Sequence, residues 1–554
     1  MSVPTRTGLA RPASAPEPPR PEPGRPRIVR RELSLVGFAV AVAFFCLSLT
    51  PSLLPRPWFL QGAVSGITAA LGYALGALVP RRFARPGVVG WRVLIVATPL
   101  PVAAFLVLGT RWQGDLRQRL GMAPPDTYYT TRMVLFSVVV FAFLLLIARN
   151  LLLATRSVVL LLCRFTPQPV AYCTGVVVVA VLAVTAVDNL VVGNFFAMAD
   201  RKASLRNDGT DSNVVAPVSS LRSGGPYSLA PWDTLGRQGR GFVARGPSRA
   251  QLSEFAGRPA VEPIRVYAGL DSADSIAARA RLVLREMDRT GAFDRAVVAV
   301  VIPTGTGWVD SAVTNSLEYM YAGNTAMVSM QYSYLPSWAS FMIDRSTVVD
   351  AASALITAVQ QRWAAMPVGQ RPKLLLFGES LGSLGTEATF GSIQRMAAGA
   401  DGILLEGPTF ANPLRNQIIE RRTPGTPVWD PAYAPEPIEF AAQPAELRNP
   451  VWPAPKVIYL QNSSDPVVWW SPDLLYRSPP WLRHPRGPDI SPYMHWYPGI
   501  TIWQTTVDAV FANKVPTGHG HVYKSGVVEG WAALAPPPGW TVADSIRLRV
   551  VLDG

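Results

Sequence analysis

The sequence predicts an all-α bundle of membrane-spanning helices, followed by an α/β domain whose mostly parallel sheet is covered by helices on both faces. Three observations lead to this prediction. Five long apolar stretches follow one another between residues 33 and 192. Beyond residue 262, short apolar runs alternate with amphipathic ones, which is typical of α/β domains. Within that alternation lies the run Gly378-Glu379-Ser380-Leu381-Gly382.

The apolar stretches cover residues 33–53, 59–79, 91–109, 131–148 and 170–192. Each is close to the ~20 residues that a helix needs to cross the hydrocarbon core of a bilayer. A shorter apolar piece, residues 151–163, is interrupted by Arg156, and we expect it to lie along the membrane surface. We therefore predict a membrane domain over residues 32–196 with about five transmembrane helices.

Arginine is unevenly distributed around these stretches. The tail before the first stretch carries seven arginines, and the second and fourth connections are also arginine-rich, whereas the opposite side holds fewer. Because positive charge accumulates on the cytoplasmic side, we expect a cytoplasmic N-terminus and, after five spans, an extracytoplasmic α/β domain. The formal net charge of +14 lies almost wholly before residue 200, so it reflects membrane topology and gives no reason to expect a nucleic-acid partner.

Composition divides the rest of the chain. Residues 1–31 are rich in proline and arginine and should form a disordered tail, and residues 197–260 should form a linker and irregular entry. The catalytic α/β domain is expected over residues 261–554, with an insertion around 471–500 that is dense in Pro, Trp and Tyr. All three cysteines precede residue 197, so the α/β domain uses neither disulfides nor thiolate metal ligands.

The apolar runs of the α/β domain predict its strands and helices. Two segments, 274–289 and 348–366, have helical spacing. The strands are expected at 264–268, 296–302, 326–332, 373–377, 402–406 and 456–461.

Ser380 is the candidate nucleophile. The strand predicted at 373–377 runs into the G-x-S-x-G pentapeptide, and a helix-compatible stretch continues to about residue 396. In this context the serine occupies a tight turn between strand and helix, with its hydroxyl held out over the edge of the sheet. The motif therefore predicts a serine hydrolase.

A serine needs a base, and the chain offers four histidines. His519 and His521 fit the chain order of nucleophile, acid and then a late histidine. We favour His519, because glycine flanks it on both sides and indicates a loop, and His521 remains the alternative. An H-x-H pair can also bind zinc, but no third ligand lies at a recognisable spacing, so we expect no metal and no cofactor.

Asp465 is the candidate acid that orients the base. It follows the strand predicted at 456–461, at the end where open α/β sheets hold their functional residues. Glu406, at the end of the preceding strand, is the alternative. Asp508 is less favoured because it falls in an apolar helical pattern.

An oxyanion hole requires backbone N–H groups directed at the developing negative charge. Leu381, directly after the nucleophile, should supply one. The second should come from the loop after the strand at 296–302, where Gly305 or Thr306 is the candidate.

Several longer runs carry a resemblance to a known family. They are the region around Ser380, residues 318–320 (Glu-Tyr-Met), residues 331–338 (Gln-Tyr-Ser-Tyr-Leu-Pro-Ser-Trp) and residues 516–521 (Pro-Thr-Gly-His-Gly-His). In these runs the chain resembles the actinobacterial membrane-anchored α/β-hydrolase family, which pairs a multispanning N-terminal region with a C-terminal hydrolase domain. The resemblance covers nearly the whole chain after the tail. It implies an α/β-hydrolase fold and a serine nucleophile at Ser380, and it names no substrate.

These observations together predict a membrane-anchored esterase or lipase that acts on a lipid or an acylated component of the cell envelope. Its expected partners are membrane lipids and that substrate. Acyl transfer by the same triad is an alternative, because only the group that accepts the acyl chain differs. A further alternative is a catalytically silent protein in which the domain binds a ligand or is coupled to transport by the membrane helices.

Overall fold

The computed structural model describes residues 33–79, 88–186, 204–335, 345–435, 437–448 and 455–553. The predicted tail over residues 1–31 lies outside these ranges, as does the beginning of the predicted linker. The chain forms two compact units. The larger one combines Ser34–Leu145 with Thr185–Gly554, and the smaller one contains Leu146–Val184.

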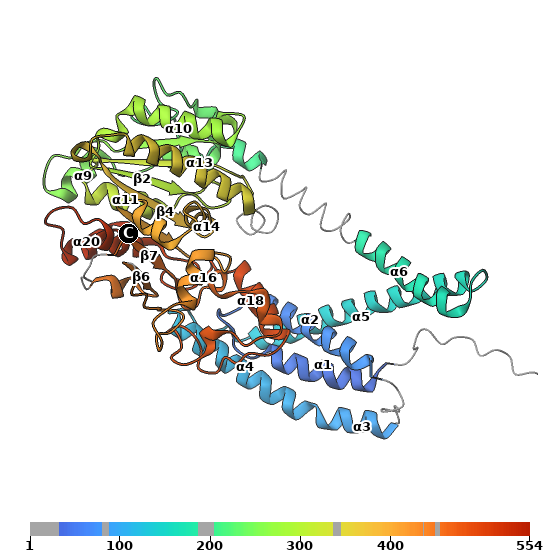
Figure 1. The fold of residues 1–554 in the computed structure, drawn as a ribbon. Coiled ribbons are helices and arrows are strands. Elements are labelled where there is room, and N and C mark those ends of the chain that lie inside the picture. Colours follow the sequence, from blue (N-terminus) through green and yellow to red (C-terminus); the bar gives the residue numbers. More distant parts are fainter. Residues whose placement is uncertain are drawn as a thin grey trace, which may run out of the picture. The chain divides into compact units, whose positions relative to one another are not determined.

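Among the described residues, the apolar N-terminal part contains the helices α1 to α6 (Figure 1). Four helical segments of this described part are long and apolar enough to cross a membrane, namely Trp58–Ala77, Val88–Arg119, Tyr129–Leu162 and Gln168–Ala186. The first helix is shorter. The bounds are α1 Leu35–Ser48, α2 Trp58–Ala77, α3 Val88–Ala97, α4 Pro99–Arg119, α5 Tyr129–Leu162 and α6 Gln168–Ala186.

Three of these helices differ from the expected boundaries. α4 ends at Arg119, beyond the expected end at residue 109. α1 ends at Ser48 instead of near residue 53, because Pro51, Pro55 and Pro57 have no backbone N–H and cannot continue a helix. Residues 49–57 instead form a non-helical link, called here the α1–α2 connection. Residues 151–162 continue α5 rather than forming a separate surface helix, which makes α5 34 residues long. In the smaller unit, the end of α5 packs on α6 where Val159 meets Gly175.

A seven-stranded, fully parallel sheet forms the centre of the C-terminal part, in the order β1-β3-β2-β4-β5-β7-β6. Six strands lie where apolar runs predicted them, and their side chains are buried almost throughout. The strands are β1 Ile264–Ala268, β2 Val297–Ile302, β3 Thr325–Met330, β4 Lys373–Glu379, β5 Gly402–Glu406, β6 Ile438–Ala441 and β7 Val457–Leu460.

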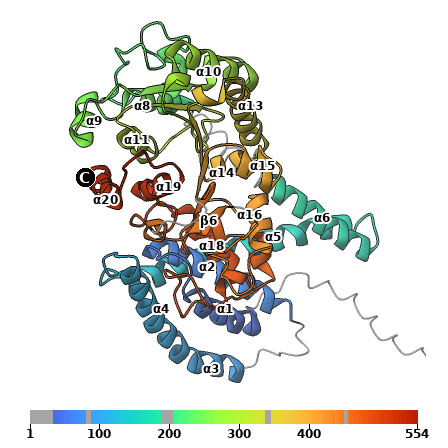
Figure 2. The same ribbon diagram turned by 60° about the vertical axis from the view of Figure 1, so that its left-hand side comes forward.

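Helices cover both faces of this sheet (Figure 2). One face carries α10 Ile276–Thr290, α13 Arg345–Ala364, α14 Leu381–Ala388 and α16 Pro413–Glu420, which pack on one another in sequence order. The opposite face carries α9 Arg249–Ala256, α11 Ser311–Met320, α19 Val527–Leu534 and α20 Val542–Asp553. Two further helices of the described chain lie near the sheet, α8 Gly236–Ala244, beside β1, and α15 Ile393–Ala398. The layered α/β architecture predicted from the sequence is confirmed.

A second, smaller core lies outside the sheet. It is called here the insertion core, and it joins residues around α17 Pro466–Trp469 and α18 Ile500–Val510 to two leucines of the α1–α2 connection. Leu53 and Leu54 are buried in it. The helical N-terminal part and the α/β domain therefore share one apolar core. The members are Leu53, Leu54, Val428, Val468, Trp469, Leu474, Trp481, Leu482, Ile490, Met494 and Ala512.

Candidate active site

Ser380 occupies the turn between β4 and α14. Its backbone has φ 56° and ψ −117°, a conformation that an L-residue with a side chain adopts at a cost of ~1–3 kcal/mol. The Ser380 N–H donates to the carbonyl of Glu406, at the end of the neighbouring strand β5, with an N–O distance of 2.8 Å. The strained turn is thus fixed against the sheet, as a nucleophile elbow requires.

The second glycine of the pentapeptide, Gly382, is required by a close backbone contact. A Cβ atom at this position would collide with the carbonyl oxygen of Ile302, at the end of β2, and would lie 3.0 Å from the carbonyl oxygen of Pro303. The start of α14 therefore lies directly against the loop that follows β2. This contact brings Leu381 next to residues 303–308, the two segments expected to form the oxyanion hole.

Asp465 forms a hydrogen bond with His521. The carboxylate Oδ2 lies 2.6 Å from Nδ1 of the imidazole, and both side chains are buried. Asp465 caps α17 in the loop after β7, while His521 belongs to the loop between α18 and α19. An ionised carboxylate accepts the Nδ1 proton, so the neutral imidazole presents Nε2 as its basic nitrogen.

Two further donors hold Asp465 in place. The hydroxyl of Tyr523 donates to the same Oδ2 atom over 2.8 Å, and the Val467 N–H donates to Oδ1 over 2.8 Å. The Tyr523 hydroxyl in turn accepts the N–H of Asn462, 3.1 Å away. Each carboxylate oxygen therefore has a fixed partner in addition to the histidine.

The His521 ring lies over the end of strand β5. A Cβ atom on Gly407 would clash with Cε1 of the ring and lie 2.8 Å from its Nδ1. Gly407 directly follows Glu406, whose carbonyl accepts the Ser380 N–H. Because β4 and β5 are neighbours in the sheet, the histidine and the serine occupy adjacent strand ends.

His519 has a different partner. Its Nδ1 atom lies 3.0 Å from Oδ2 of Asp489, which also accepts the Ser464 hydroxyl over 2.7 Å. The Ser464 oxygen accepts the N–H of Gly520, the residue between the two histidines. The structure thus pairs Asp465 with His521 and not with His519, the histidine favoured by its flanking glycines.

The environment of His521 raises its pKa above the ordinary value of 6.5. Burial by itself lowers the pKa, whereas the charge and hydrogen bond of Asp465 raise it, and Glu379 adds to the increase only where it is ionised. Asp465 therefore stabilises the imidazolium that forms when His521 accepts a proton.

Two glutamates lie on the same face of neighbouring strands beside the serine. Glu379 and Glu406 are register partners in β4 and β5. Burial, together with the charges of Asp310 and Asp465, raises the pKa of Glu379 to about 8, although His521 acts in the opposite direction. Burial and the neighbouring carboxylates also raise the pKa of Glu406 well above its ordinary value. Glu379 is therefore neutral at pH 7. Glu406, the alternative acid, forms no hydrogen bond with a histidine among the described residues.

The loop after β2 is held by hydrogen bonds between its own backbone groups. The Thr304 N–H donates to the Trp308 carbonyl over 3.1 Å, and the Gly307 N–H donates to the Thr304 carbonyl over 2.9 Å. The Thr306 carbonyl accepts a hydrogen bond from Gln331. Within the described part of the chain the Thr306 N–H has no acceptor, and it lies in the same loop as Gly305. Leu381 is the first residue of α14, so its N–H has no acceptor within the helix.

Sequence reasoning missed Tyr523 and Asp310. Tyr523 lies two residues beyond His521, but a tyrosine at that spacing has no distinguishing pattern. Asp310 caps α11 through the Ala312 N–H, and burial raises its pKa.

The aromatic residues near the site divide into two groups. Trp469 fills the insertion core, whereas Trp308 is 39% exposed beside the loop after β2. Among the described residues, no group of three or more His, Cys, Asp or Glu side chains is arranged to hold a metal ion.

A parallel sheet with a strained serine at the end of a central strand, and a histidine and an aspartate from later loops, defines a hydrolase-like fold of the α/β class. Comparison with known families agrees. The profile described as "Alpha/beta-hydrolase family" matches residues 264–548, slightly more than half of the chain. A second profile, "Alpha/beta-hydrolase family N-terminus", matches residues 49–247. The chain therefore belongs to this α/β-hydrolase family. No curated protein and no solved structure matches it significantly.

Proposed function

We propose that this protein is a membrane-anchored serine hydrolase that cleaves carboxylic esters of a lipid or of an acylated component of the cell envelope. The observation that carries the proposal is the buried Asp465–His521 hydrogen bond at the strand end next to Ser380. The triad consists of Ser380, His521 and Asp465. From the resemblance in residues 331–338, we also propose that the chain is one of the actinobacterial, membrane-anchored members of its family.

The chemistry follows from these positions. His521 Nε2 takes the Ser380 hydroxyl proton as Oγ attacks the acyl carbon, and Asp465 stabilises the resulting imidazolium. The N–H groups of Leu381 and of Gly305 or Thr306 donate to the oxyanion of the tetrahedral intermediate. His521 then gives its proton to the leaving alkoxide, which departs as the alcohol and leaves an acyl-serine. Water, activated by the same histidine, hydrolyses that ester.

The membrane placement of the domain is supported by an argument that depends on a single crossing, that of α1. It requires α1, whose 14 residues are fewer than the ~20 of a typical span, to cross the membrane. The α1–α2 connection packs against α18 of the α/β domain, so both belong on the same side of the membrane. The arginine-rich tail precedes α1, so the positive-inside rule puts the tail in the cytoplasm and the connection outside. The hydrolase domain is then extracytoplasmic, next to lipids and envelope glycoconjugates.

The test is ester hydrolysis by the purified full-length protein in detergent, using p-nitrophenyl esters with acyl chains of increasing length. We expect turnover that is lost in Ser380→Ala. The proposal predicts a preference for longer chains, because the exposed Trp308 offers an apolar surface beside the site. Equal turnover by wild type and Ser380→Ala would exclude Ser380 as the nucleophile.

A further inference from the structure

We propose that the α1–α2 connection is a positioning element of the active site, and that Arg56 acts through Asp508 and α18 to hold the loop of His521. The inference rests on the proposed function, since it concerns the orientation of the catalytic base. It assigns a role in catalysis to the membrane helices, beyond anchoring the domain.

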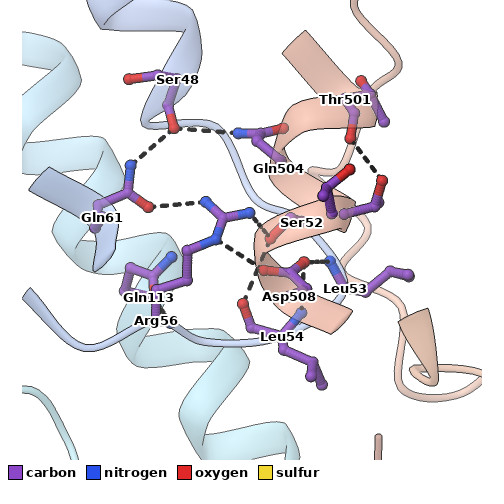
Figure 3. Close-up of polar contacts among 12 residues, drawn as sticks. Ser48, Ser52, Leu53, Leu54, Arg56, Gln61, Gln113, Thr501, Gln504 and Asp508 are labelled. Carbon is purple, nitrogen blue, oxygen red and sulfur yellow. Dashed lines mark hydrogen bonds and ion pairs between the residues drawn. The ribbon is translucent and has the colours of Figure 1, made fainter. Parts of the chain in front are cut away.

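Arg56 and Asp508 form a buried ion pair. The Arg56 Nε atom lies 2.8 Å from Asp508 Oδ1, and the two side chains are only 2% and 0% exposed. The second carboxylate oxygen accepts the backbone N–H groups of Leu53 and Leu54, over 3.1 and 3.3 Å. One carboxylate on α18 therefore binds both the side chain and the backbone of the connection (Figure 3).

The other two guanidinium nitrogens of Arg56 also have partners. The guanidinium donates to Oε1 of Gln61, on α2, over 2.9 Å, and to the Ser52 hydroxyl. The backbone of Arg56 is held as well, because its N–H donates to Gln113 on α4 and its carbonyl accepts the Tyr129 hydroxyl at the start of α5. Arg56 therefore joins α2, α4, α5 and α18 at a single point.

Gln504 adds a second link one helical turn before Asp508. Its Nε2 atom donates to the Ser48 carbonyl over 3.1 Å (Figure 3). It also donates to the Thr50 carbonyl, 3.0 Å away. These carbonyls belong to the end of α1 and the start of the connection, where helical hydrogen bonds stop. α18 is therefore fixed to the connection by two side chains on one of its faces.

α18 leads directly to the catalytic loop. Two residues beyond its end, the Ala512 carbonyl accepts the N–H of His521 over 2.9 Å. A Cβ atom on Gly520 would lie 2.6 Å from the Ala512 carbonyl oxygen and 3.5 Å from Leu54 Cδ1. The backbone of His521 is thus hydrogen-bonded to the segment that follows α18, and a side chain of the connection lies nearby.

The insertion core supports the other half of the Asp–His pair. Leu53 and Leu54 pack in the same cluster as Val468 and Trp469 of α17, the helix that Asp465 caps. Ala512 belongs to this cluster too. One apolar core therefore supports the loop of Asp465 and the loop of His521, and the connection fills part of it.

A buried charge without its partner is strongly destabilising, so removing either member of the pair should displace α18 from the connection. A displacement of well under 1 Å at a catalytic group is sufficient to slow the reaction. A positioning role therefore predicts a loss in kcat that exceeds any loss of folded protein.

The test compares Arg56→Gln, Asp508→Asn and the double variant with wild type, all as full-length protein in detergent. The matched control is Arg265→Gln, which breaks the equally buried Arg265–Glu318 pair between the edge strand β1 and α11. A fluorophosphonate probe gives two readouts, the final amount of labelled protein and the rate constant per labelled site. Ester hydrolysis gives kcat and KM, and a pH series gives the apparent pKa of the base.

We expect Arg56→Gln and Asp508→Asn to lower the rate constant per labelled site and kcat by about tenfold or more. KM should change by less than about threefold, and the apparent pKa of His521 should fall as its contact with Asp465 loosens. The double variant should recover part of the rate, since no lone charge remains. Arg56→Lys keeps the positive charge and should fold more readily than Arg56→Gln. Its rate constant and kcat should lie between those of wild type and Arg56→Gln. Arg265→Gln should reduce only the amount of labelled protein.

Wild-type rate constants and pH profiles in every Arg56 and Asp508 variant would overturn the positioning role and leave the hydrolase proposal standing. A wild-type protein that is folded and neither labelled nor active would instead refute the hydrolase proposal, and the positioning role with it.

Discussion

His521 Nδ1 lies 2.6 Å from Oδ2 of Asp465, although 56 residues separate the two in the chain. The neighbouring histidine, His519, forms a parallel contact with Asp489. Two His–Asp contacts therefore hold a single glycine-rich loop at two points. This arrangement explains the Gly-His-Gly-His pattern, because Gly520 separates two histidines that contact different aspartates.

The pH profile should show a base with a raised pKa. His521 must be neutral to accept the serine proton, so activity is lost as the pH falls through its pKa. The charge and hydrogen bond of Asp465 raise that pKa, so kcat/KM should rise with pH through an inflection above 6.5. In Asp465→Asn the inflection should move to lower pH and the rate should fall by about 10⁴-fold. A wild-type inflection at or below 6.5 would contradict this arrangement.

Glu379 should produce the alkaline limb of the same profile. The pKa of Glu379 is raised to about 8, so its carboxyl group is neutral at pH 7 and becomes charged as the pH rises through about 8. A carboxylate beside Ser380 repels the oxyanion of the tetrahedral intermediate, so we expect activity to decline through about pH 8. Glu379→Gln should remove the decline and leave the acidic limb in place. If the decline persists in Glu379→Gln, another group is responsible for it.

Tyr523→Phe should slow the reaction moderately. The change removes one hydrogen bond to Asp465 and leaves the Asn462 N–H without its acceptor. A loss of ~1–1.5 kcal/mol corresponds to about a five- to tenfold fall in kcat. Tyr476→Phe is the matched control, because it removes an exposed tyrosine-to-aspartate hydrogen bond to Asp473 and should leave kcat unchanged. Equal effects of the two substitutions would argue against a role for Tyr523 in the site.

The sequence predicted the sheet because its strands are buried on both faces and therefore appear as continuous apolar runs. The strand β6 was missed. It is a four-residue edge strand that contains Glu439 and follows a proline-rich stretch, so it has no such run. The position of Ser380 was predictable for a local reason, because strand, elbow and helix are consecutive in the chain.

The proposed partners of Ser380 were harder to predict because they depend on long-range contacts. Flanking glycines favour a loop at His519, but they do not determine which histidine meets Asp465. That is decided by the Ala512 carbonyl, which binds the His521 N–H, and by Gly407, which leaves room for its ring. Asp508 was discounted because it lies in an apolar helical pattern. Its partner, Arg56, is 452 residues away, a separation at which no local pattern indicates a contact.

The proposed orientation can be tested with single cysteines. After Cys46, Cys163 and Cys173 are replaced by serine or alanine, Val368→Cys places a thiol at a 79% exposed position of the hydrolase domain. A membrane-impermeant maleimide should label it in intact cells. Ser14→Cys, in the arginine-rich tail, should be labelled only after lysis. The reverse pattern would place the hydrolase domain in the cytoplasm.

The central claim is that Ser380 is a nucleophile activated by His521 and Asp465. Its most direct test is to treat the full-length protein with a fluorophosphonate and locate the adduct by peptide mass spectrometry, alongside labelling rates for His521→Ala and His519→Ala. We predict an adduct on Ser380, a loss of labelling by about 10⁴-fold or more in His521→Ala, and a rate within about tenfold of wild type in His519→Ala. An adduct on another residue, or a greater loss in His519→Ala than in His521→Ala, would contradict the proposed triad.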